Sequence, residues 1–336
     1  MNRILLAASA VALLADLAGV SDEPRFAVEP KTSLTKAFET TVHLASTRFH
    51  VSVDGDDEPS DEAGDATLSL DNFERIELTD EYMAMGKDRP AKLKRTFDKL
   101  AGTQKQSTKG PHGEEGDDDE RKEESPLEGK SVLFTWNDDG SKFDASFPEG
   151  KGDEKLLEDL VEDTDFRAFL PKGKVAKDET WEVDAKSFDS ILAPGGDLKL
   201  DAPPQEGEEK PDSGDDLGMQ IRKHLEGKVH ATWKGVRDED GHKVGVIAIS
   251  AELESEGELE SKEKDAAKST FKTKFDLEGE LLWDLAAGHF RSLRSSGKTQ
   301  LSMKTTAKLE FGEGESAEMR QEIDFEGEFS FKASAQ

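Results

Sequence analysis

The sequence predicts a mainly β protein with long antiparallel strands, arranged in curved sheets or a partly open barrel, together with two or three short helices. Apolar and charged residues alternate over ten or more positions in several C-terminal segments, which is the period of a half-buried strand. Gly-containing or Asp-Gly turn signals separate many of the alternating segments. Helical spacing of apolar residues is confined to two short stretches in the middle of the chain.

The clearest alternation begins in the stretch STFKTKFDLEGELLWDL and continues through TQLSMKTTAKLEF and EMRQEIDFEGEFSFKA. A slip of one residue would turn each apolar row toward water, so the register of these strands is well defined. If the apolar face holds a ligand, the side chains that we expect to face it are Phe271, Phe275, Leu281, Trp283, Leu301, Met303, Phe325 and Phe329.

The earlier segments also predict strands and hairpins. The stretch ERIELTDEYMAMGKDRPAKLKRTFDKL indicates two strands joined around Gly86, with Pro90 in a loop or at an edge. The stretch SVLFTWNDDGSKFDASF predicts a hairpin over NDDG. The stretch GHKVGVIAISAELE is apolar on both faces near Val246 and Ile249, which is typical of a central strand that is covered on both sides.

Two stretches predict helices. The first, DEKLLEDLVEDTDFRAFLP, ends at Pro171 and has its apolar side chains at helical spacing, namely Leu156, Leu157, Leu160 and Val161. The second, SGDDLGMQIRKHLEG, places Leu217, Ile221 and Leu225 on one face.

These patterns divide the chain into four parts. Residues 1–21 form a signal peptide, because Arg3 precedes an apolar run over residues 4–14 and small residues follow. Residues 22–150 form an N-terminal β-rich half, 151–226 a linking region with short helices and an acidic loop, and 227–336 a C-terminal antiparallel β meander. We therefore expect a secreted or periplasmic protein with no membrane span after signal cleavage.

Composition narrows the function classes. The chain has 336 residues, a net charge of −30 and no cysteine. Its charge repels the phosphates of nucleic acids, so no nucleic-acid partner is expected. Without cysteine there are no disulfides, thiolate metal sites or cysteine nucleophiles. The acidic Pro/Gly-containing loops indicate solvated segments, and a role for them in cation binding is a third, weaker interpretation.

No catalytic motif is present. The seven histidines form no HxH or HExxH pattern, and the chain has no GxSxG elbow, P-loop or GxGxxG. The sequence therefore favours a protein that is not an enzyme and that has no metal or cofactor. The alternative is a secreted hydrolase that uses acidic residues in a cleft, because a pair of carboxyls with separated pKa values is sufficient for such chemistry.

The stretch FRAFLPKGKVAKDETWEVDAKSF resembles a motif of uncharacterised secreted bacterial proteins, which read Leu-Pro, Val and then a Trp-Val strand. The matching positions here are Leu170, Pro171, Val175, Trp181 and Val183. The family usually has Gly shortly before the Trp, where this chain has Asp-Glu-Thr.

The stretch GELLWDLAAGHFRSL is similar to the strand, Asp-x-x-x-Gly turn, strand element of the same proteins, through Asp284 and Gly288. The likeness covers residues 127–293. It implies an exported β-rich domain of unknown function, with a remoter similarity to LolA-like half-barrel carriers of the periplasm, and no catalytic residues come with it.

An apolar sheet face must be covered, because large exposed apolar patches are rare on soluble proteins. A second sheet, the short helices, closure into a barrel or a bound apolar ligand would each cover it. The sequence therefore predicts an exported, non-enzymatic binding or structural protein, whose partner is an apolar ligand or a protein of the cell envelope.

Overall fold

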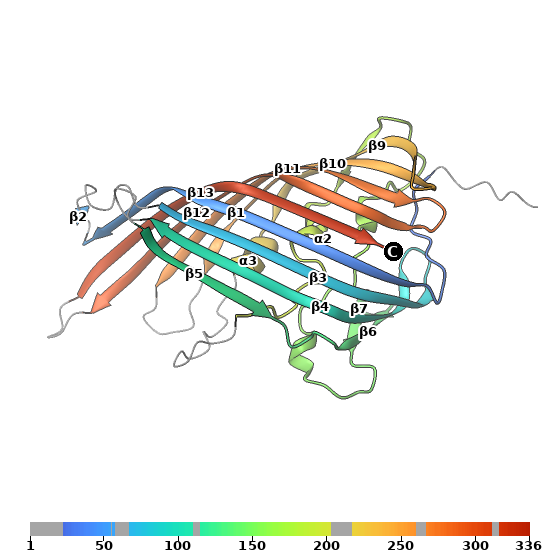
Figure 1. Ribbon diagram of the computed structural model, residues 1–336, viewed down its shortest axis with the longest axis horizontal. Coiled ribbons are helices and arrows are strands. Elements are labelled where there is room, and N and C mark those ends of the chain that lie inside the picture. Colours follow the sequence, from blue (N-terminus) through green and yellow to red (C-terminus); the bar gives the residue numbers. More distant parts are fainter. Residues whose placement is uncertain are drawn as a thin grey trace, which may run out of the picture.

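In the computed structural model, one sheet of 13 strands dominates the molecule (Figure 1). The structure describes residues 23–54, 56–57, 67–109, 115–202, 217–259, 267–310 and 316–336. The strand order is β7-β6-β4-β3-β1-β13-β12-β11-β10-β9-β8, while β2 pairs with β1 and β5 pairs with β4. All paired neighbours run antiparallel. Because β7 and β8 end the order, the described sheet is open, and the predicted mainly β fold with long antiparallel strands is confirmed.

The strands of the first half are β1 (Ser33–Val53), β2 (Asp56–Asp57), β3 (Thr67–Met85), β4 (Pro90–Lys109), β5 (Glu115–Glu124), β6 (Ser131–Asn137) and β7 (Lys142–Ser146). Those of the second half are β9 (Glu226–Glu239), β10 (His242–Leu259), β11 (Lys268–Asp284), β12 (His289–Glu310) and β13 (Ser316–Ala335). The first strand pairs with the last, β1 with β13, so both halves of the sequence form one continuous sheet.

Long strands give the sheet two distinct ends. We call the end with the β3–β4 turn at Gly86 and the β11–β12 turn at Gly288 the near end, and the opposite end the far end. The strand β12 has 22 residues, which corresponds to about 70 Å of extended chain. The predicted hairpins at Gly86 and at NDDG are confirmed as β3–β4 and β6–β7.

Residues 147–225, which we call the connecting segment, join the two halves. They contain η2 (Glu154–Leu157), η3 (Arg167–Phe169), β8 (Thr180–Val183), η4 (Ala185–Phe188), α2 (Asp189–Leu192) and α3 (Leu217–Lys223). The second predicted helix is confirmed as α3. Its apolar residues Leu217 and Ile221 face the sheet.

The first predicted helix, over DEKLLEDLVEDTDFRAFLP, is wrong in length. Only two short 3₁₀ turns form there, because Asp159 has a φ of 60° and Phe166 a φ of 56°. Leu160 makes a β-bridge to Gly196, and Val161 is 45% exposed. Tertiary contacts with the sheet thus outweigh the helical spacing of its leucines.

The main core lies at the near end, between the concave face of the sheet and the connecting segment (Figure 1). Phe166 of the connecting segment stacks edge-on against Phe290 with ring centroids 4.8 Å apart, and it also contacts Phe38 and Phe331. All four rings are at most 1% exposed. A fully buried aromatic ring of this kind contributes roughly 1.5–3 kcal/mol, so these contacts hold the connecting segment against the sheet.

Close strand contacts on the concave face depend on glycine. A Cβ atom at Gly297 would lie 2.0 Å from the carbonyl oxygen of Asp276, and one at Gly327 would lie 1.7 Å from that of His43. Both glycines are in the phase that faces the core, on the neighbouring strands β12 and β13. Only glycine leaves room for backbone to approach this closely.

Candidate functional site

A second apolar cluster lies on the far half of the concave face, and its buried members are distinct from those of the main core. Its buried members are Leu44, Phe271, Leu301 and Phe325. Half-buried side chains pack against them: Val42, Leu68, Leu70, Leu217, Ile221, Leu259, Met303 and Ile323. We call this whole set the far cluster. It draws on β1, β3, β10, β11, β12, β13 and α3.

Four of the eight side chains that we expect to face a ligand meet in the far cluster: Phe271, Leu301, Met303 and Phe325. The other four belong to the main core or pack against it: Phe275, Leu281, Trp283 and Phe329. In particular, the indole nitrogen of Trp283 donates to the carbonyl oxygen of Arg25 at 3.0 Å. A ligand-facing role therefore remains a prediction for the far-cluster residues.

The short helix α3 covers part of the far cluster and is held at its C-terminal end. The ammonium group of Lys186 donates to the carbonyl oxygens of Arg222 and Lys223 at 2.7 and 2.6 Å. These carbonyls have no partner inside the helix, and a cation at this end is favourable. Leu217, at the other end of the helix, packs against the far cluster.

The concave face changes from apolar to polar across neighbouring strands. Phe329 on β13 is followed by Val42 on β1, Asn72 on β3 and Gln104 on β4 in one row of the register. The next row toward the far end runs from Gly327 through Leu44 and Leu70 to Gln106. Gln104 and Gln106 are exposed. The far cluster therefore has a polar, water-facing border on the β4 side.

Three polar side chains, Thr40, Asn72 and Glu74, lie at this border, and we call them the polar trio. Thr40 is directly opposite Glu74, and Asn72 is opposite Val42 in the next row. The amide nitrogen of Asn72 donates to Glu74 at 3.3 Å. Within the described part of the chain, the hydroxyl of Thr40 and the amide oxygen of Asn72 are buried without a hydrogen-bond partner, an arrangement that costs about 1–3 kcal/mol per group.

Sequence reasoning missed a buried ion network at the near end. On the sheet, Lys36, Asp80 and Arg95 are each 0% exposed. The Arg95 guanidinium donates twice to the Asp80 carboxylate, at 2.8 and 2.9 Å. The ammonium group of Lys36 donates to Asp80 at 2.8 Å and to the Tyr82 hydroxyl at 3.0 Å.

The same network holds the connecting segment. Arg95 donates to the carbonyl oxygens of Val161 and Glu162 at 2.8 and 2.7 Å and to the Thr164 hydroxyl at 2.8 Å. Lys36 pairs with Asp165. Because the central groups are sealed from solvent, they are unable to meet a substrate, and the network acts to position the connecting segment.

Burial and charge shift two carboxyl groups of the network in opposite directions. Burial by itself would raise the pKa of Asp80, but the charges of Arg95 and Lys36 outweigh it and lower the pKa to about 2. Burial raises the pKa of Glu162 to about 7, although Arg167 opposes the shift. The Asp80 carboxyl therefore stays ionised at neutral pH, whereas the Glu162 carboxyl gains or loses its proton near neutral pH.

A signal for the network is present in the sequence. Lys36 has the same strand phase as Leu34 and Phe38, and Arg95 has that of Leu93 and Phe97. An ionisable side chain in the apolar phase of a strand is rarely buried unless it is paired. Such positions therefore predict an internal ion pair, although they do not identify its partner.

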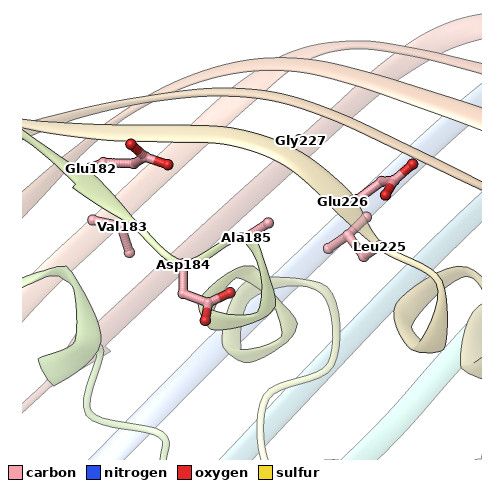
Figure 2. A pocket seen from close by; sticks show the side chains of 7 residues that line it. All are labelled: Glu182, Val183, Asp184, Ala185, Leu225, Glu226 and Gly227. Carbon is pink, nitrogen blue, oxygen red and sulfur yellow. The ribbon is translucent and has the colours of Figure 1, made fainter.

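A surface hollow of about 480 Å³ lies beside the edge strand β8 (Figure 2). Its lining includes the carboxylates of Glu182, Asp184 and Glu226 and the apolar residues Val183 and Leu225. Figure 2 shows that Glu182 and Glu226 lie apart and that Asp184 points away from both. The carboxyl groups do not converge as the acid–base pair of a hydrolase would.

The described residues contain no group of three or more His, Asp or Glu side chains placed to hold a metal ion. The acidic stretch over residues 54–66 lies mostly outside the described residues, and the signal peptide predicted for residues 1–21 lies wholly outside them. In the described part of the chain, no helix has the length and apolar character needed to cross a membrane.

Neither a scan against protein-family models nor a search of the curated proteins finds a match to this chain. The resemblance to secreted bacterial proteins and to LolA-like carriers therefore stays a prediction.

Proposed function

We propose that this chain is an exported, non-enzymatic binding protein that holds an amphipathic molecule by its apolar chain on the far cluster. The observation that carries the proposal is that the buried residues of the far cluster are distinct from those of the main core, with Val42 packing against both. The main core is covered by aromatic side chains of the connecting segment. On the far half, α3 supplies only Leu217 and Ile221 among the described residues.

The segments that precede α3 and that join the far strand ends offer few apolar side chains for this surface. Residues 203–216, which lead into α3, read PPQEGEEKPDSGDD and contain no large apolar residue. The segments that join the strand ends nearby, 58–66, 260–266 and 311–315, contain only one, Phe311. The described chain begins beside Gly288 at the near end, where Ala27 donates to the Gly288 carbonyl oxygen. These features favour an external apolar occupant over a segment of this chain.

Leu68, Leu70, Met303 and Ile323 are half-buried members of the far cluster, and Leu70 is paired with exposed Gln106 across the β3–β4 ladder. An apolar chain laid across them would remove the remaining apolar area from water, at roughly 25 cal/mol per Å². The predicted export rests on the N-terminal sequence. No observation on the described residues favours the hydrolase alternative.

Binding of the neutral fluorescent probe N-phenyl-1-naphthylamine tests the proposal. Leu70→Gln is expected to weaken probe binding about tenfold, which corresponds to ~1.4 kcal/mol. The matched control is Phe73→Gln, on the convex face of the same strand, where the side chain is 42% exposed. Absence of binding to the wild-type protein, or equal affinity of both variants, would refute the proposal.

A further inference from the structure

The polar trio, at the border of the far cluster, contains two buried polar atoms that have no hydrogen-bond partner within the described residues. Asn72 offers an amide oxygen, which only accepts hydrogen bonds, and this oxygen is buried without a partner in the described structure. Thr40 is 7% exposed and its hydroxyl is likewise unpaired. A buried polar atom without a partner is rare in native proteins and calls for a water, an ion or a ligand group.

The negative charges around the polar trio determine which charge a ligand group there can carry. Glu74 receives a hydrogen bond from Asn72, and it lies opposite Gly102 of β4. Glu123 of β5 has its carboxylate over Gly102 on the same face. Two carboxylates here, in a chain with a net charge of −30, disfavour a further anion by repulsion.

We propose that Thr40, Asn72 and Glu74 form a head-group subsite of the far cluster, for an amphipathic molecule whose head donates hydrogen bonds, as an ammonium or hydroxyl group does. This inference rests on the proposed function, because the apolar chain of the same molecule occupies the far cluster. A donor head would satisfy the Asn72 oxygen, whereas a carboxylate or phosphate head has no proton to donate when ionised.

The register of β1 and β3 allows one amphipathic molecule to contact both the polar trio and the far cluster. Asn72 is opposite Val42, and the next residue pair in the same face is Leu44 and Leu70. The two pairs are neighbours along β1 and β3, about 7 Å apart at two residues of extended strand. A head at the trio therefore places the start of its chain on Leu44 and Leu70.

Displacement of N-phenyl-1-naphthylamine by dodecylamine, dodecanol and dodecanoate, each below its micelle concentration, tests this assignment. For the wild-type protein we expect dodecylamine and dodecanol to displace the probe at concentrations at least about tenfold lower than dodecanoate does, a difference of ~1.4 kcal/mol. Glu74→Gln should reduce the preference for dodecylamine over dodecanoate by about fivefold or more. Asn72→Leu should weaken dodecylamine and dodecanol alike.

The control variant is Glu81→Gln, an exposed residue of the same strand on the convex face, which changes the net charge by the same amount as Glu74→Gln. Equal effects of the two Gln variants, or equal displacement by all three heads, would overturn the head-group assignment while leaving the far cluster as a binding surface. If the probe itself fails to bind, the proposed function fails as well. Thermal melts of each variant verify that it is folded.

Discussion

Replacing Arg95 by methionine is expected to destabilise the protein by about 3–5 kcal/mol, the usual cost of breaking a buried ion pair from one side. The structure shows why the cost lies in this range. Arg95 makes two hydrogen bonds to Asp80 and three to the connecting segment. Methionine fills a similar volume but leaves those acceptors buried with fewer donors, and each unsatisfied group costs about 1–3 kcal/mol.

Urea unfolding followed by tryptophan fluorescence measures this effect, with stability taken from the midpoint and the slope. The matched control is Arg75→Met on β3, whose side chain is 42% exposed and pairs with Glu39 and Glu77. An exposed pair of this kind contributes little to stability, because water and salt screen its charges, so Arg75→Met should shift the midpoint much less than Arg95→Met.

Arg95→Lys serves as a second variant in case Arg95→Met does not fold. Lysine keeps the positive charge but lacks the forked guanidinium, so the free energy of unfolding of Arg95→Lys should lie between those of the wild type and Arg95→Met. Equal midpoints for Arg95→Met and Arg75→Met would refute the assignment of the network as the contact that fixes the connecting segment.

Three further outcomes are expected. Because the pKa of Glu162 is raised from 4.5 to about 7, its contribution to stability is full below pH 4.5 and is lost as pH rises to 7, by about 3 kcal/mol. In the Glu162→Gln variant the urea midpoint should therefore depend less on pH between these values. If its pH dependence equals that of the wild type, the raised pKa of Glu162 is contradicted. The pKa of Asp80 is lowered from 3.8 to about 2, so its contribution, about 2 kcal/mol, is present above pH 3.8 and is lost on acidification toward pH 2. Asp80→Asn should remove that acid-side loss, which acid titration of the circular dichroism signal would detect. Finally, Gly327→Ala should destabilise the protein by an overpacking cost of about 1–3 kcal/mol and so lower its melting temperature. In the control Gly173→Ala nothing lies within 4 Å of the new Cβ, so the melting temperature should stay nearly unchanged.

The alternation of side chains was sufficient to predict the long strands with one apolar face, but not β5, which forms in an acidic stretch that we expected to be a solvated loop. Phe325 is 3% exposed and lies on β13 between exposed or partly exposed charged residues, as its odd position in the pattern indicates. This works because successive side chains on a strand point to opposite faces, so a local pattern reports the two environments directly. The predicted gathering of Phe271, Leu301, Met303 and Phe325 on one face follows from the same register.

The predicted helix over residues 153–171 shows where local patterns fail. Its leucine spacing is helical, but the carbonyl oxygens of Val161 and Glu162 are taken by Arg95 of β4, 66 and 67 residues earlier in the chain. No local pattern contains that distant donor. The polar trio is a similar case, because Thr40 and Asn72 come together only through the pairing of β1 with β3.

By itself, the sequence determined which segments form the long amphipathic strands, which of their faces is apolar and how acidic the outside is, because these properties depend on neighbours along the chain. Only the tertiary structure decided that β1 pairs with β13, that the apolar face divides into a main core and a far cluster, and that Lys36, Asp80 and Arg95 meet in the interior. The physical reason is that pairing order and burial depend on contacts between residues far apart in sequence. Two strands with the same alternation become fully buried or only partly covered according to what lies across from them.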